Sequence, residues 1–151
     1  MSNTPWFDRE EILGTLDKRV TGLLAGYRQN CALLGCEGIG KTTLLKRFLE
    51  KLDCRTPLVA FSLEVRQKES VPEWANRFLQ SLLYGLLKAK NVPALPTELP
   101  SLLTACSQWI PEPVHTIQRL LKKMESSVNE EIYDGVLELP QRVTQESGLL
   151  C

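Results

Sequence analysis

The sequence has little of what metal sites, disulfide frameworks and membrane segments need. It contains one histidine, His115, and five cysteines that form no C-x-x-C pair, which argues against a structural zinc site. The odd number of cysteines is typical of reduced thiols in a cytosolic protein. No apolar run reaches the ~20 residues that cross a bilayer, and the N-terminus lacks the pattern of a signal peptide. We therefore expect a soluble cytoplasmic protein with no membrane partner.

Net charge is also lacking, because 18 basic and 18 acidic side chains balance each other. No polybasic run occurs, so the charge pattern does not indicate nucleic acid as a partner. The 151 residues fit one domain of ordinary size, and 43% of them are apolar, which is enough to form a hydrophobic core. We expect a single domain over residues 1–151.

The spacing of apolar residues predicts helices and strands in alternation over the first half of the chain. A helix is expected to begin at Asp8, with Glu11 completing a capping box three residues later. Short apolar runs predict buried strands at 31–35 and 57–65, and an amphipathic helix from Lys41 lies between them. A strand, a glycine loop, a helix and a second strand in this order indicate an α/β fold with a parallel sheet.

The second half of the chain has helical spacing throughout. A long helix is expected to begin at Ser70, which can form a capping box with Glu73, and to end near Lys90. A proline-rich stretch with one short helical piece follows it. Two further helical patterns cover 114–124 and 132–143, the second of them kinked at its proline.

The strongest motif is the glycine loop Gly35–Thr42, which fits G-x-x-x-x-G-K-[ST], the Walker A or P-loop pattern. Glycines at its inner positions can take positive φ, so that backbone amides approach phosphate oxygens closely at the start of a helix. The lysine is expected to bind the β- and γ-phosphates, and the threonine hydroxyl is expected to bind Mg²⁺. The motif therefore predicts binding of ATP or GTP as the magnesium complex, with no catalytic residue assigned. The predicted cofactor-binding residues of the loop are Gly35, Cys36, Glu37, Gly38, Ile39, Gly40, Lys41, Thr42 and Thr43, with Thr42 as the metal ligand.

The residues around this loop resemble the AAA+/STAND-type ATPases, and most closely their archaeal-type ATPase relatives. The resemblance rests on Phe7–Glu10, Asn30–Gly35 and Lys41–Phe48. It implies a P-loop NTPase three-layer sandwich, ATP as the nucleotide, and Phe7 and Arg9 on the adenine side of the pocket. Taken by themselves, these two residues fit a structural role equally well, with Phe7 as an apolar contact and Arg9 as a surface charge at the start of a helix.

The C-terminal residues resemble the segment that leads into the acidic strand of these ATPases. Leu139–Gly148 looks like the lead-in helix, and Leu149–Cys151 looks like the first residues of the strand. The resemblance implies an N-terminal fragment of a longer ATPase with an incomplete sheet, and uncovered strand edges would favour self-association. Hydrolysis is not supported by this chain alone, because the acidic residue that holds Mg²⁺ is missing. Two alternatives stay open: a non-catalytic nucleotide-binding remnant and a small-molecule P-loop kinase.

Overall fold

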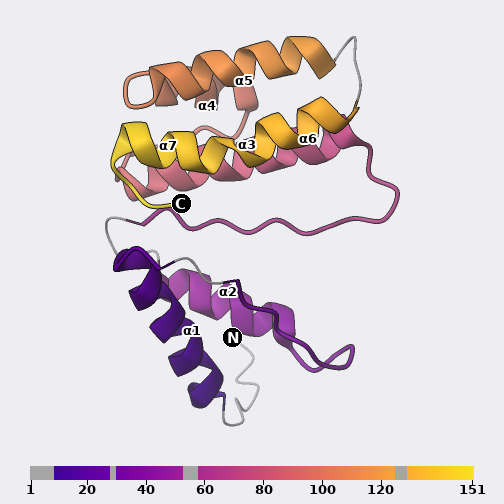
Figure 1. The fold of residues 1–151 in the computed structure, drawn as a ribbon, viewed down its shortest axis with the longest axis vertical. Coiled ribbons are helices and arrows are strands. Elements are labelled where there is room, and N and C mark those ends of the chain that lie inside the picture. Colours follow the sequence, from indigo (N-terminus) through magenta and orange to yellow (C-terminus); the bar gives the residue numbers. More distant parts are fainter. Residues whose placement is uncertain (1–8, 28–29, 53–57, 125–128) are drawn as a thin grey trace. The chain divides into compact units, whose positions relative to one another are not determined.

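The computed structural model describes residues 9–27, 30–52, 58–124 and 129–151. The chain forms two compact units, Met1–Lys51 and Leu52–Cys151 (Figure 1). The described residues form seven α-helices and contain no β-strand. The helices are α1 (Glu10–Leu24), α2 (Lys41–Leu52), α3 (Val71–Ala89), α4 (Leu99–Cys106), α5 (Pro111–Met124), α6 (Asn129–Leu137) and α7 (Leu139–Ser147).

In the first unit, α1 and α2 form where the apolar spacing predicts helices. They are joined by an ion pair in which Lys51 Nζ lies 2.7 Å from Asp17 Oδ2. The residue before α1 is Arg9, whose side chain makes no capping hydrogen bond to the helix. The predicted capping residue Asp8 lies outside the described residues. Two acidic residues in the first turn of α1 stabilise the helix, because their negative charges lie at the positive end of its dipole.

In the second unit, α3 begins at the predicted capping box. The hydroxyl of Ser70 accepts a hydrogen bond from the amide of Glu73 at 3.4 Å. The carboxylate of Glu73 accepts bonds from the hydroxyl of Ser70 at 2.7 Å and from its amide at 2.9 Å. These two bonds lower the pKa of Glu73, with the hydroxyl contributing most. The box is confirmed, and it satisfies amides that a helix start leaves without partners.

The core of the second unit surrounds α3, which packs against α4 and α6, while α5 packs against α6 (Figure 1). The pattern predicted over 132–143 is two helices, because α6 ends at Leu137 and α7 begins at Leu139. The break precedes Pro140, which cannot donate a backbone hydrogen bond and restricts the residue before it. The largest fully buried side chains of this core are Leu79, Leu82, Leu83, Leu86, Leu87, Leu102, Ile110, Ile117, Ile132, Val136 and Leu139.

The predicted parallel sheet is wrong, and so is the α/β sandwich that it implied. The predicted strands 31–35 and 57–65 form no ladder in the described part of the chain. Among the described residues, these segments form one parallel bridge, between Leu58 and Leu150, in which the amide of Val59 donates to the carbonyl of Leu150 at 2.7 Å. A strand exists only when a neighbouring segment pairs with it over several residues, and apolar spacing does not supply that neighbour.

Apolar side chains of the second predicted strand pack on a helix instead. Val59 is buried in the core, and Phe61 and Leu63 are partly buried against it. The ring of Phe61 meets the ring of Phe78 on α3 edge to face, with centroids 5.4 Å apart. The apolar run that suggested a buried strand is thus partly buried against α3 without forming a ladder.

The first predicted strand is not buried. Cys31 and Ala32 are exposed, and the side chain of Leu34 is 89% exposed. Self-association was expected because a partial sheet would have uncovered edges. The described residues form no sheet, so this argument for self-association no longer applies. Exposed apolar side chains such as Leu34 and Val65 remain on the surface. None of the described helices combines the length and the apolar character that crossing a membrane requires.

Candidate phosphate-binding site

The glycine loop forms the connection that leads into α2. It turns at residues 36–39, where the amide of Ile39 donates to the carbonyl of Cys36 at 3.4 Å. Gly38 and Gly40, on either side of Ile39, have φ of +78° and +87°, which is the conformation expected from the motif. Side chains rarely tolerate this region, so both positions require glycine on conformational grounds.

The loop ends at the amino terminus of α2, as predicted. The first helical bond of α2 runs from the amide of Leu44 to the carbonyl of Gly40 at 3.0 Å. The amides of the preceding three residues have no partner within a helix, and the helix dipole adds partial positive charge there. No acidic residue lies in the first turn of this 12-residue helix to oppose an anion. The start of α2 therefore favours a phosphate group electrostatically.

Lys41 and Arg9 both contact loop carbonyls. The ammonium of Lys41 donates to the carbonyls of Gly35 at 2.7 Å and Cys36 at 2.8 Å, so it lies over the beginning of the loop. The guanidinium of Arg9 donates to the carbonyl of Ile39. Two cationic groups from different parts of the first unit thus meet at one short loop.

The other predicted site residues are mostly exposed. Thr42 and Thr43 lie exposed in the first turn of α2, and Cys36, Glu37 and Ile39 are exposed in the loop. Within the described ranges, no group of three or more histidine, cysteine, aspartate or glutamate side chains could hold a metal ion.

Nothing in the described residues tests the adenine-side role implied for Phe7 and Arg9. Phe7 lies outside the described residues. Arg9 contacts the glycine loop through the carbonyl of Ile39, which is 30 residues away in the sequence. The resemblance suggested Arg9 as a nucleotide-binding residue, but no local sequence pattern indicates its contact with Ile39. The adenine-side role stays a prediction.

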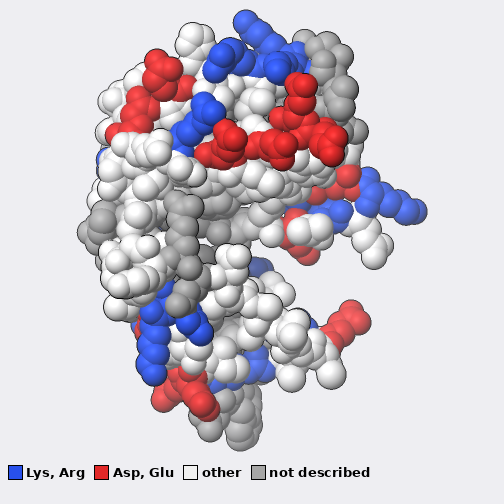
Figure 2. All heavy atoms as spheres, in the orientation of Figure 1, with Lys and Arg blue, Asp and Glu red and all other residues white. Residues whose placement is uncertain are grey.

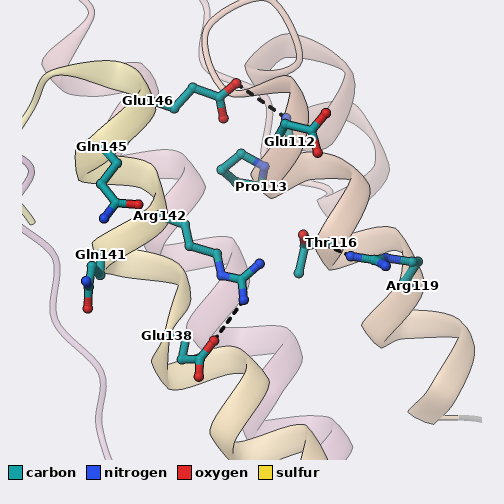
Figure 3. Close-up of a pocket in the computed structure, with 9 residues that line it drawn as sticks. All are labelled: Glu112, Pro113, Thr116, Arg119, Glu138, Gln141, Arg142, Gln145 and Glu146. Atoms are coloured by element: carbon teal, nitrogen blue, oxygen red, sulfur yellow. Dashed lines mark hydrogen bonds and ion pairs between the residues drawn. The ribbon is translucent and has the colours of Figure 1, made fainter.

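The second unit contains a polar groove between α5 and α7 that sequence reasoning did not indicate (Figure 3). Its volume is about 740 Å³. Arg142 forms an ion pair with Glu138 at 2.9 Å, and the carboxylate of Glu146 accepts a bond from the backbone amide of Glu112 at 3.5 Å. Acidic and basic side chains also alternate over the face of the second unit seen in Figure 2. This mixture favours no ligand of one charge.

Comparison with known proteins does not place this chain in a family. No protein-family model, curated protein or solved structure matches the chain. The absence of a sheet among the described residues contradicts the AAA+/STAND relationship expected from Phe7–Glu10, Asn30–Gly35 and Lys41–Phe48, so that prediction is wrong. The Walker A pattern is thus a local motif at the start of α2, and the described residues around it form helices and no strand.

Proposed function

We propose that Gly35–Thr42 binds the phosphate groups of a nucleoside triphosphate, with ATP as the expected ligand. The observation that carries the proposal is the pair of positive φ angles at Gly38 and Gly40, directly before the amino terminus of α2. Such a sequence of turns lets successive amides point toward one anion. The helix terminus then adds further amides and partial positive charge.

The ammonium of Lys41 supports the proposal through its reach. It donates to two loop carbonyls at 2.7 and 2.8 Å, so it lies beside the loop that is proposed to hold the phosphate. Hydrogen bonds from an ammonium to a phosphate are stronger than those to a neutral carbonyl. Binding therefore exchanges two bonds within the protein for stronger bonds to the ligand.

Mg²⁺ is the cofactor proposed with ATP. The ion would screen the phosphate charges, and the exposed hydroxyl of Thr42 is the side chain proposed to bind it. The proposal covers binding and not turnover. Turnover would also need an acidic ligand for Mg²⁺ at the end of an apolar run. Glu64 follows the apolar run that begins at Leu58, but its side chain is exposed, and its backbone carbonyl accepts a bond from Arg77.

Calorimetric titration of the full chain with ATP, ADP, AMP and adenosine, each with Mg²⁺, tests the proposal. We expect affinity to rise with each added phosphate and adenosine to give no measurable heat, because the loop contacts phosphate and not the base. GTP is expected to bind as well if the base is not recognised.

Two results would contradict the proposal. Equal affinity for adenosine and ATP would show that the phosphates are not the groups recognised. No binding of any triphosphate at millimolar concentration, with the helical circular dichroism intact, would leave the loop as a non-binding remnant.

A further inference from the structure

The contact between Arg9 and the loop has a consequence for the proposed phosphate site. The guanidinium of Arg9 donates to the carbonyl of Ile39, which belongs to the same peptide group as the amide of Gly40. In a trans peptide the carbonyl and the amide point in opposite directions. Whatever holds the carbonyl of Ile39 on the side of Arg9 also aims the amide of Gly40 at the opposite side.

We propose that Arg9 is a positioning residue of the phosphate site, which fixes the Ile39–Gly40 peptide so that the amide of Gly40 is aimed at phosphate. This inference rests on the proposed function. Arg9 acts through the peptide and does not itself touch the nucleotide. Its partner, the carbonyl of Ile39, lies between the two glycines with positive φ, where the backbone has the most freedom to rotate.

The fit of Arg9 against Gly40 is close. A Cβ added at Gly40 would lie 3.1 Å from Nη1 and 3.5 Å from Nη2 of Arg9, so the guanidinium would have to shift by a few tenths of an ångström. The φ of +87° requires glycine at residue 40, and an added Cβ would also press against the guanidinium. At Gly38 an added Cβ would meet nothing within 4 Å, so the close approach distinguishes the two glycines.

The chemistry of arginine suits this task. Its planar group presents several donors in a fixed geometry, whereas a lysine ammonium on a flexible stem holds a carbonyl less rigidly. Lys41 contacts carbonyls at the start of the loop, and Arg9 contacts one at its end. Since α1 carries Arg9 at its amino terminus, the helix anchors the end of the loop before any ligand arrives.

The first test uses the full chain without ligand. In protein labelled with ¹⁵N-glycine, the amide resonance of Gly40 is assigned by its loss in Gly40→Ala. We expect Arg9→Ala to move this resonance and to speed its exchange with solvent. Lys18→Ala, which removes the same charge from an exposed position of α1, is expected to leave it unchanged. An unmoved Gly40 resonance in Arg9→Ala would overturn the inference.

The second test measures nucleotide affinity. Loss of one aligned amide is expected to weaken ATP and ADP by the same factor, about three- to tenfold, in Arg9→Ala. Arg9→Lys keeps the charge and is expected to recover part of the affinity together with part of the Gly40 shift. Loss of affinity in Arg9→Ala without a change at Gly40 would mean that Arg9 touches the nucleotide directly, which overturns the positioning role.

The two tests separate this inference from the proposed function. If the wild-type chain binds no nucleotide, the proposed function fails, while the Gly40 resonance still decides whether Arg9 orients the peptide. If the wild type binds ATP and Arg9→Ala binds it equally well, the inference fails and the proposed function stands. Circular dichroism of each variant shows whether its helices are intact, and Arg9→Lys provides a second variant if Arg9→Ala does not fold.

Discussion

Replacing Leu83 by alanine is expected to lower the free energy of unfolding by about 2–5 kcal/mol. Leu83 lies on α3 with its side chain fully buried in the core of the second unit. Its carbonyl also accepts a bond from the thiol of Cys106 on α4 at 3.8 Å, which places it where two helices meet. Truncation removes transfer energy and leaves a cavity that the packed helices fill only in part.

Urea denaturation followed by circular dichroism at 222 nm measures this effect. The matched control is Leu137→Ala, which makes the same chemical change at a side chain that is 57% exposed and is expected to cost much less. Leu83→Met nearly conserves volume and is expected to cost less than about 1.5 kcal/mol, so it remains measurable if the alanine variant does not fold. Equal losses at residues 83 and 137 would contradict the core described for this unit.

Replacing Lys41 by alanine is expected to weaken ATP binding about tenfold to 150-fold. The estimate follows from losing a charge-assisted hydrogen bond to phosphate, worth roughly 1.5–3 kcal/mol. At micromolar nucleotide the binding is then expected to disappear. A fluorescent ATP analogue titrated into each protein measures the change.

Two further variants isolate the role of the ammonium. Lys46→Ala removes the same charge from an exposed position of α2, and its effect on affinity is expected to be small. Lys41→Met keeps most of the side-chain length without the charge and is expected to behave like Lys41→Ala. Unchanged binding in Lys41→Ala, or equal losses in Lys41→Ala and Lys46→Ala, would show that general charge and not this lysine attracts the nucleotide.

The helices could be predicted from the sequence because the signals for a helix are local. The apolar stripe of α3 and its Ser70–Glu73 capping box lie within the helix or next to it, and both are present. The prediction of strands failed because a ladder needs a distant segment as its partner, which a local apolar run does not reveal. The apolar run after Leu58 has one bridge to Leu150, and its side chains Phe61 and Leu63 pack toward the helical core.

In the candidate site, too, the local features could be predicted from the sequence and the long-range contact could not. The positive φ of Gly38 and Gly40 and the helix start at Lys41 follow from a short motif. The contact of Arg9 with Ile39 joins residues 30 apart in the sequence, and no spacing rule indicates it. The resemblance to AAA+/STAND ATPases added a sheet, since it carried over a whole fold from short stretches around one motif. A motif of eight residues specifies local backbone geometry far better than it specifies the surrounding fold.

The most direct test of the central claim is to observe which backbone amides respond to a triphosphate. Amide resonances of the uniformly ¹⁵N-labelled full chain, recorded during titration with ATP and Mg²⁺, identify those residues. We expect the largest saturable shifts at Gly35–Thr43, and the same residues are expected to respond to pyrophosphate, which has no base. Shifts confined to the helices α3–α7, or no saturable shift at the loop, would contradict phosphate binding at this site.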